Sequence, residues 1–318
     1  MRPLLLTFDA FNTLFHPRQP VPVQYAAAAS SFNVHVSPSA LQSAFRVAFK
    51  AQSASHPNYG RDLALRGEYA GPPQWWGDVI RGSFARALSE SDHNRNPTGK
   101  TEANKYEVPD ALVQDLLDRF ASARAYKLYD DVGPFFRKVR AQLEASQRGR
   151  KVVVGVVSNS DDRISSVLES LGVSVRDARA GEEKTRQGHD LPGFEEEREK
   201  ATQAKGSSSP LQAQERKDLD FILTSYQVGA EKPDPLVWDV ALRTAQQLHA
   251  ESETVGNAGD WERIHVGDDY GKDYRGATNA GWKAYYLPRE DAEAATHVPE
   301  GTKTINSLLD LLSELESK

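Results

Sequence analysis

Five short apolar segments, separated by stretches with helical periodicity, constrain the fold of this chain more than any other feature. They cover residues 4–8, 152–157, 221–224, 263–266 and 283–287. A continuous apolar run of this length is typical of a strand buried on both faces of a sheet. Strands that alternate with helices predict a parallel sheet with helices on both sides. We therefore predict an α/β protein with a Rossmann-like, doubly wound parallel sheet.

A helical unit interrupts this pattern just after the first predicted strand. Between residues 17 and 130, apolar side chains recur at helical spacing, and Ser37-Pro38 has the form of an N-cap followed by a first-turn proline. All the other predicted strands follow this unit, so we expect an insertion into the α/β domain. The predicted domains are an α/β core of residues 1–16 and 131–318 and an inserted helical domain of residues 17–130.

Two polar stretches lack apolar periodicity. We expect residues 89–106 to form a loop within the helical domain. Residues 178–218 are charged and contain a Gly-Ser-Ser-Ser run that starts at Gly206. Their composition predicts a flexible insertion in the core.

Charge and cysteine content narrow the possible functions. The 318-residue chain has 39 basic and 45 acidic side chains, a formal net charge of −6, and no cysteine. The acidic balance argues against general binding to nucleic acid or to an anionic membrane. Without cysteine there are no disulfides, thiolate zinc sites or cysteine nucleophiles. No apolar run approaches the roughly 20 residues of a membrane span. We expect a cytoplasmic protein, leaving entry into the nucleus and the oligomeric state open.

Acidic and polar residues follow four of the predicted strands, where open α/β sheets bind ligands. Asp9 follows the first strand, Ser158 the second, Lys232 lies beyond the third, and Asp268 and Asp273 follow the fourth. A carboxylate can attack phosphorus and form an aspartyl phosphate. A hydroxyl and an ammonium can hold the oxygens of the transferring group, and further carboxylates can bind Mg²⁺. The pattern predicts phosphoryl-transfer chemistry in one crevice.

These segments resemble the four motifs of the haloacid dehalogenase-like hydrolase superfamily, in the same order along the chain. They are Phe-Asp-Ala-Phe-Asn-Thr-Leu from Phe8, Val-Ser-Asn-Ser-Asp-Asp-Arg from Val157, Lys-Pro-Asp-Pro from Lys232 and His-Val-Gly-Asp-Asp from His265. Within the superfamily they are similar to the haloacid dehalogenase-like hydrolase domain-containing protein 3 family. The resemblance covers the α/β core, and the helical domain matches the superfamily's helical cap in position and character.

The resemblance implies a role for each of these residues. Asp9 is the implied nucleophile, and Ser158 and Lys232 bind the phosphoryl group. Thr13 and Asn159 join them as substrate-binding residues, with positioning of the nucleophile an open alternative for Asn159. The implied cofactor is Mg²⁺. Its implied ligands are Asp9, the backbone carbonyl of Phe11, Asp268 and Asp273, with Asp269 beside them.

Phe11 departs from the phosphatase form of the first motif, Asp-x-Asp-x-Thr. The second Asp of that form protonates the leaving alkoxide and later activates water, and phenylalanine can do neither. Acid–base catalysis contributes about 10²–10⁴-fold to a rate. We therefore expect poor hydrolysis of ordinary alkyl phosphates and a smaller loss for esters with a good leaving group.

Three functional hypotheses follow. We favour an Mg²⁺-dependent phosphatase that hydrolyses a small-molecule phosphate ester. The first alternative is a metal-independent 2-haloacid dehalogenase, because halide leaves without a proton and Asp-Ala-aromatic-x-Thr-Leu also resembles the first motif of those enzymes. Their fourth motif is Ser-Ser-Asn, however, and the acids present here would repel a carboxylate substrate. The second alternative is a catalytically weak binding protein that keeps the fold and an anion site.

Overall fold

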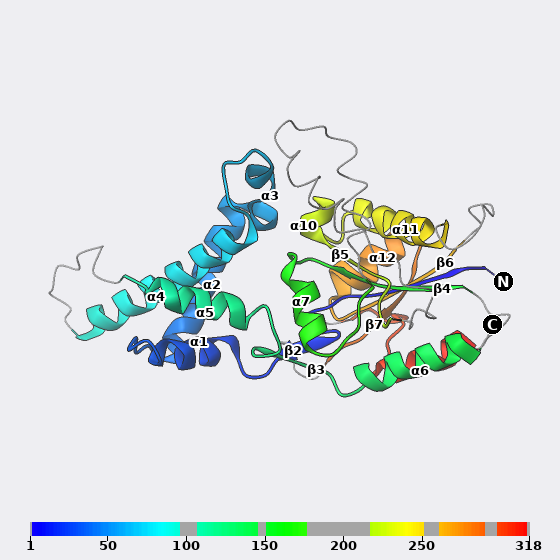
Figure 1. Ribbon diagram of the computed structural model, residues 1–318, viewed down its shortest axis with the longest axis horizontal. Coiled ribbons are helices and arrows are strands. Elements are labelled where there is room, and N and C mark those ends of the chain that lie inside the picture. Colours follow the sequence, from blue (N-terminus) through cyan, green and yellow to red (C-terminus); the bar gives the residue numbers. More distant parts are fainter. Residues whose placement is uncertain are drawn as a thin grey trace, which may run out of the picture.

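A five-stranded parallel sheet forms the centre of the protein. The computed structural model describes residues 2–95, 107–145, 151–176, 217–250, 261–289 and 298–316. The strand order is β5 (Phe221–Thr224), β4 (Val152–Ser158), β1 (Leu4–Phe8), β6 (Glu262–Gly267) and β7 (Lys283–Tyr286). All neighbouring strands in this sheet pair in parallel (Figure 1), which confirms the predicted fold class.

Strand β1 lies at the middle of this sheet. Leu4 pairs with Val152 of β4 on one side and with Glu262 of β6 on the other, and the register continues to Phe8. Every residue of β1 is buried. Burial on both faces explains why the strand is almost continuously apolar. Because β1 ends at Phe8, Asp9 emerges at the carboxyl edge of the sheet, between β4 and β6.

Helices cover one face of the sheet from three separate parts of the chain. The helices are α6 (Val132–Ala145), α7 (Arg163–Ser170) and α13 (Leu311–Glu316), the last preceded by a 3₁₀ turn, η3 (Leu308–Asp310). Their apolar side chains pack with those of alternate β1 residues, including Phe8, in one buried cluster. This face therefore holds the larger part of the hydrophobic core.

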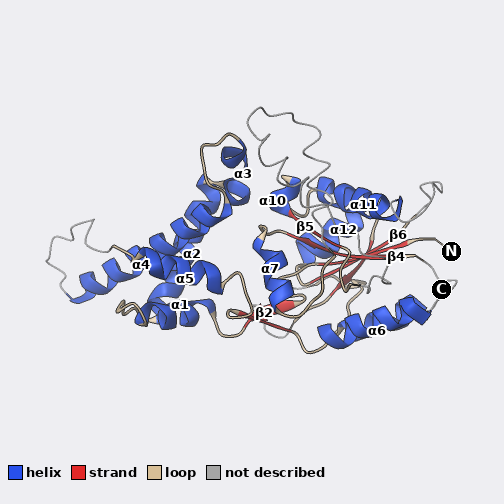
Figure 2. Cartoon of the chain, in the orientation of Figure 1, coloured by secondary structure: helices blue, strands red, loops and turns tan. Residues whose placement is uncertain are grey.

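The opposite face is covered by α11 (Pro235–Ala250) and α12 (Gly276–Asn279), with the short helix α10 (Ser225–Val228) nearby (Figure 2). Leu5 points to this side and packs in a second buried cluster with Trp238 of α11. The alternation of β1 side chains between the two clusters is the period of two that a strand imposes.

One helix differs from its predicted form. The spacing predicts an α-helix over residues 273–280, but the chain forms a π-helical segment, η2 (Tyr270–Arg275), followed by α12. Asp269 caps η2, because its carboxylate accepts hydrogen bonds from two backbone N–H groups. Within η2, Asp273 folds back under Gly267, where a Cβ atom would lie 2.2 Å from Asp273 Cγ. The wider turn and the glycine together let this carboxylate enter the interior.

The inserted part of the chain is helical. Its helices, here called the helical block, are α1 (Val21–Ser30), α2 (Pro38–Ser55), α3 (Pro57–Leu65), α4 (Pro72–Arg95) and α5 (Asp110–Arg119). Apolar side chains of α1, α2, α4 and α5 form a buried cluster of their own. As predicted, Ser37 caps α2, and its Oγ accepts a hydrogen bond from the backbone N–H of Ala40 at 3.2 Å.

The structure describes the first part of one predicted polar stretch and almost none of the other. The loop expected from residue 89 is wrong in its first part, because α4 continues to Arg95. A helix can continue through backbone hydrogen bonds without an apolar face. The apolar periodicity of the sequence therefore placed the end of α4 too early. The remainder of that loop, residues 96–106, lies outside the described residues. So does nearly all of the insertion predicted at residues 178–218.

A two-stranded antiparallel ribbon joins the helical block to the sheet domain. Strands β2 (Phe15–Pro17) and β3 (Tyr126–Leu128) pair where the chain enters and leaves the block. Three-residue strands carry no readable periodicity, and the sequence analysis missed them. The division into a core and a cap at residues 17 and 131 stays a prediction.

A search of the described helices for a long apolar segment with few charges finds none that could cross a membrane.

Gly155 in β4 provides a test of the packing between β4 and β5. A Cβ atom at this position would lie 2.3 Å from the ring of Phe221. We expect Gly155→Ala to lower the free energy of unfolding by about 1–3 kcal/mol, because overpacking strains a buried strand. Urea denaturation measures this change, and Gly155→Ala/Phe221→Leu should recover part of the loss.

Gly82→Ala in α4 is the matched control. The nearest atom to its added Cβ is Ala48 Cβ, at 3.4 Å. Alanine favours a helix by about 1 kcal/mol over glycine, so this variant should be neutral or more stable. Equal losses in the two variants would contradict the packing argument.

Candidate active site

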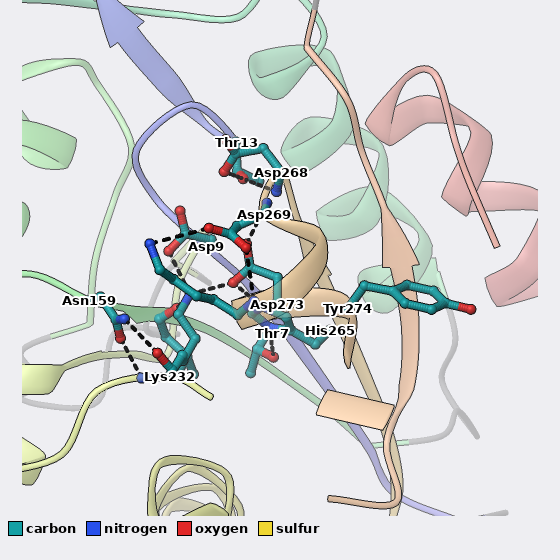
Figure 3. A network of polar contacts seen from close by, with 12 residues as sticks. Thr7, Asp9, Thr13, Asn159, Lys232, His265, Asp268, Asp269, Asp273 and Tyr274 are labelled. Atoms are coloured by element: carbon teal, nitrogen blue, oxygen red, sulfur yellow. Dashed lines mark hydrogen bonds and ion pairs between the residues drawn. The ribbon is translucent and has the colours of Figure 1, made fainter. Parts of the chain in front are cut away.

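Most of the predicted site residues meet at the carboxyl edge of the sheet, where Figure 3 shows Asp9, Lys232 and Asp273 close together. Carboxylate oxygens of Asp9, Asp268 and Asp273 lie within 4.8 Å of one another. Asp9 is held by a hydrogen bond from its backbone N–H to the carbonyl of Val266 at 2.9 Å. Thus acids that follow β1 and β6 form one cluster, as expected from parallel strands that end at the same edge.

Lys232 places a buried ammonium in this cluster. Its Nζ donates to Asp9 Oδ1 at 2.7 Å, to Asp273 Oδ1 at 2.6 Å and to the backbone carbonyl of Val157 at 2.8 Å. These contacts use all three donors of a lysine. Burial disfavours the ammonium, but the charges of Asp273 and Asp9 outweigh it and hold the pKa of Lys232 above its usual value. Lys232 is therefore charged across the physiological pH range.

Asn159 fixes the backbone of Lys232. Its Nδ2 donates to the Lys232 carbonyl at 2.9 Å, and its Oδ1 accepts from the Lys232 N–H at 2.6 Å. Both ends of the amide are thus bonded to one residue. This arrangement gives Asn159 a positioning role, while substrate binding by this side chain stays a prediction.

Asp273 is the most enclosed of the three acids. Its Oδ1 also contacts His265 Nε2 at 3.2 Å, and its Oδ2 accepts from the Asp269 N–H at 3.0 Å. Burial opposes ionisation, yet Lys232 and His265 together lower the pKa of Asp273. Burial lowers the pKa of His265, and its Nδ1 lies 2.9 Å from Thr7 Oγ1. The sequence analysis missed both His265 and Thr7 as partners, although each lies in a segment that it singled out.

Asp9 and Asp268 differ in the cation beside them. Burial raises the pKa of Asp9, while Lys232 and a hydrogen bond from Ser158 oppose the rise. Among the residues that the structure describes, no lysine ammonium pairs with Asp268, whereas Lys232 pairs with Asp9 and Asp273. Burial, then Asp9, then Asp273 raise its pKa to about 7. Its carboxylate therefore sits in a site with excess negative charge.

Thr13 connects Asp268 to the rest of the fold. Its Oγ1 donates to Asp268 Oδ1 at 3.2 Å and accepts from the Asp268 N–H at 3.1 Å. The carbonyl of Thr13 accepts from Arg289 Nη2 at 2.7 Å, and Arg289 Nη1 pairs with Asp131 Oδ2 at 3.0 Å. The same Asp131 oxygen accepts from the side chain of Ser307 at 2.9 Å. No sequence signal pointed to Arg289, because its partners are more than 150 residues away.

The side chains of two predicted residues, Asp269 and Phe11, are not members of the acid cluster. The carboxylate of Asp269 bonds the N–H groups of Gly271 and Lys272, both at 2.9 Å, and is not one of the three clustered acids. Phe11 is 41% exposed, and its ring contacts those of Phe15 and Tyr126. Metal binding by the Phe11 carbonyl stays a prediction.

The helical block reaches the site through α3 and α4, by contacts that no sequence pattern indicated. Asn58 Nδ2 and Arg61 Nε donate to the carbonyls of Ser225 at 2.8 Å and Tyr226 at 2.6 Å. Trp76 Nε1 donates to Asp161 Oδ2 at 2.7 Å. These partners follow β5 and β4 directly, so the block contacts the edge of the sheet that carries the acids.

Comparisons with known proteins concern the family and the fold. No protein-family model matches the chain. The haloacid dehalogenase-like hydrolase domain-containing protein 3 of Bos taurus is 29% identical over 283 residues, covering 89% of this chain and 81% of that protein. The Mus musculus protein of the same name is 28% identical over 322 residues, covering 98% and 95%. A solved L-2-haloacid dehalogenase shares the fold, with a TM-score of 0.56 at 15% identity over 99% of this chain and 100% of that one.

The sheet, the four strand-end segments in order and these relatives support the assignment of the chain to the haloacid dehalogenase-like hydrolase superfamily. Within that superfamily it is similar, over most of its length, to the domain-containing protein 3 relatives.

The Asp131–Arg289 pair predicts a pH-dependent contribution to stability. Despite burial, hydrogen bonds from Arg289 and Leu308 lower the pKa of Asp131. A carboxyl whose pKa is lower in the folded state stabilises the fold above its unfolded pKa of about 3.9, and the effect is lost as the pH falls through the folded pKa. At pH 7, Asp131→Asn should cost about 3 kcal/mol, because it leaves Arg289 buried without its charge partner.

Urea denaturation at several pH values tests this expectation. The gap between wild type and Asp131→Asn should narrow as the pH falls below about 4. Asp110→Asn is the control, because the Asp110 side chain is 90% exposed in its pair with Arg81 and exposed pairs contribute only about 0–1 kcal/mol. A gap that does not change with pH would contradict the prediction.

Proposed function

We propose that this protein is an Mg²⁺-dependent phosphatase that hydrolyses a small phosphorylated molecule through an aspartyl phosphate on Asp9. The observation that supports this most directly is the packing of three carboxylates within 4.8 Å of one another, two of which pair with Lys232. With Asp268 ionised, three negative charges face one positive charge, so the cluster carries 1 − 3 = −2. A divalent cation would balance that charge.

The donor set fits magnesium. Mg²⁺ prefers hard oxygen ligands and is usually held by one or two carboxylates together with water and substrate phosphate. Asp268 is the best placed of the three, because no ammonium neutralises it and its pKa of about 7 reflects burial among like charges. Asp9, Asp273 and the Phe11 carbonyl complete the proposed ligand set. When bound, the ion would offset the repulsion between these carboxylates and an anionic phosphate.

The residues at the edge of the sheet have complementary roles in the proposed reaction. A carboxylate oxygen of Asp9 forms a bond to phosphorus as the bond from phosphorus to the leaving oxygen breaks. Ser158 holds a phosphoryl oxygen while charge redistributes, and Lys232 does the same by exchanging one of its three hydrogen bonds for a bond to the substrate. Water then attacks phosphorus, releases inorganic phosphate and restores Asp9. Since Phe11 offers no proton, the leaving oxygen departs with its electron pair and takes a proton from solvent.

A second candidate, haloacid dehalogenation, has one observation in its favour. Phe11 supplies no general acid, and halide needs none. The charge of the site opposes this function, however, because a 2-haloacid is itself a carboxylate and would meet three acids. We therefore place phosphoryl transfer first, and tests with and without metal separate the two functions.

Replacing Asp9 tests the nucleophile. With phenyl phosphate and Mg²⁺, Asp9→Asn should lower the rate of phosphate release by at least about 10⁴-fold, as expected when a nucleophile is removed. Asp239→Asn makes the same change on an exposed acid of α11 that lies outside the four motifs, and it should keep wild-type activity. Wild-type rates in Asp9→Asn would sink the assignment, and 2-chloropropionate turnover in EDTA would favour the dehalogenase.

Replacing Asp268 tests the metal site. We expect Asp268→Asn to raise the half-saturating Mg²⁺ concentration for phenyl phosphate hydrolysis by about tenfold or more, because residues that merely support ligands already have effects of this size. Isothermal titration with Mg²⁺ provides a readout that does not depend on turnover. An unchanged Mg²⁺ affinity would remove Asp268 from the proposed ligand set.

A further inference from the structure

An aromatic cluster on the helical block lies beside the candidate active site. Tyr59 of α3 contacts Trp75 and Trp76 of α4, with ring centroids 5.2 and 6.2 Å apart, and Phe49 of α2 contacts both tryptophans at 5.4 and 6.0 Å. Trp75 is buried at 2% exposure and belongs to the packed interior of the block. Phe49 is exposed, Tyr59 and Trp76 are partly buried, and all three lie outside the block's main buried cluster. These three residues therefore present aromatic surface at the border of the block.

The backbone that presents Tyr59 is strained. Asn58, Tyr59 and Gly60 all have left-handed backbone angles, with φ values of 45°, 59° and 72°. For a bulky residue such as tyrosine this conformation is an outlier that persists only where the surroundings enforce it. The side chain of Asn58 enforces it here through hydrogen bonds with the carbonyl and the hydroxyl of Ser225. Such strain is concentrated at ligand-binding positions in proteins.

Tyr59 lies close to two of the segments that form the site. Its hydroxyl is 3.4 Å from the carbonyl of Asn159, the residue after Ser158. It also interacts electrostatically with Glu231, the residue before Lys232, and with the Tyr126 phenol. Burial raises the pKa of the Tyr59 phenol and raises that of Tyr126 to about 12. Both are therefore neutral aromatic groups at the border of the site.

Phe11 and Tyr126 form the aromatic border on the sheet side. Their ring centroids are 6.1 Å apart, and Phe11 is exposed although it lies only two residues after Asp9. Tyr126 interacts with the Arg163–Asp161 pair, over which Trp76 packs with its ring 4.4 Å from the guanidinium. Aromatic groups from the block and from the sheet domain thus approach the same ion pair.

That ion pair contributes little net charge. Arg163 donates to both oxygens of Asp161 at 2.8 Å, and Trp76 donates to one of them. Burial opposes ionisation of Asp161, but Arg163 lowers its pKa. The guanidinium is therefore matched by a carboxylate rather than available to an anionic tail. The surroundings of the phosphoryl site suit an uncharged, flat, apolar group.

On the basis of the proposed function, we propose that the substrates are aryl phosphates, in which a planar aromatic ring is attached directly to the ester oxygen. Tyr59, Trp76, Phe11 and Tyr126 are the proposed contacts of the ring. Two independent features require this class. The aromatic border fits a planar ring, and the absence of an acid at Phe11 requires a leaving group that departs as an anion. In the first step the bond between phosphorus and the aryl oxygen breaks, and the phenolate leaves with the electron pair and is protonated by solvent.

Four phosphorylated compounds, an acyl phosphate and three phosphate esters, separate the role of the leaving group from the role of the ring. Acetyl phosphate has a good leaving group and no ring. Phenyl and benzyl phosphate both carry a ring, but only phenyl phosphate releases a phenolate. Cyclohexylmethyl phosphate matches benzyl phosphate in its alkoxide leaving group and lacks the flat ring. We expect kcat/KM for phenyl phosphate to exceed that for benzyl phosphate by about 10²-fold or more, and KM for benzyl phosphate to be about tenfold below that for cyclohexylmethyl phosphate.

Variants of the aromatic border test the contacts. Tyr59→Leu and Trp76→Leu should each raise KM for phenyl phosphate about tenfold and leave KM for acetyl phosphate and inhibition by inorganic phosphate unchanged. Trp76→Phe should restore part of the loss, because it keeps a ring. Leu65→Ala is the control, since Leu65 is on α3 but 71% exposed, and it should behave as wild type. A purely structural role would change acetyl phosphate hydrolysis and phosphate inhibition as well.

The outcomes distinguish this inference from the proposed function. If wild type hydrolyses neither acetyl phosphate nor phenyl phosphate with Mg²⁺, the proposed function fails and this inference fails with it. If it hydrolyses either compound but treats benzyl and cyclohexylmethyl phosphate alike, or phenyl and benzyl phosphate alike, only the aryl phosphate class is overturned. Equal losses for all esters in Tyr59→Leu and Trp76→Leu would also overturn it.

Discussion

The ammonium of Lys232 is the contact on which the arrangement of the site depends. It joins Asp9 after β1, the carbonyl of Val157 in β4 and Asp273 beyond β6, all within 2.8 Å. A buried charge is costly unless it is paired and fully hydrogen-bonded. The Lys232 ammonium is both paired and fully hydrogen-bonded only where the three strand ends come together. The alignment of the strand ends and the burial of this charge therefore depend on each other. Asn159, by holding the backbone of Lys232 from both sides, fixes the point from which the side chain extends.

The sequence predicted the sheet well because each strand is buried on both faces and reads as an apolar run. It also predicted that Asp9, Ser158, Lys232, Asp268 and Asp273 follow the strands, since parallel strands end at one edge. It did not predict the π-helical turn that buries Asp273, because periodicity cannot tell a wider turn from an α-helix over so few residues. Nor could it pair Arg289 with Thr13 or Trp76 with Asp161, because contacts between distant segments leave no local pattern.

Phe11 and the aromatic residues of the helical block both bear on which phosphate esters the proposed enzyme would select. The phenylalanine removes a proton donor next to the nucleophile, and its exposed ring adds apolar surface there. Tyr59 and Trp76 bring further aromatic surface from a separate part of the chain. In the proposed enzyme, selectivity would therefore rest on the stability of the departing anion and on the shape of the group that carries it. The clustered acids would serve any phosphate monoester equally.

The pairing of β2 with β3 also bears on how such proteins diversify. Because the chain enters and leaves the helical block through neighbouring strands, the two ends of the inserted segment are held side by side. Insertions whose ends lie close together are tolerated without disturbing the host domain. Helices between residues 17 and 126 can thus be lengthened, lost or exchanged during evolution while the register of the sheet and the acid cluster stay unchanged. The ribbon therefore lets the helices around the site and the residues of the acid cluster evolve independently of each other.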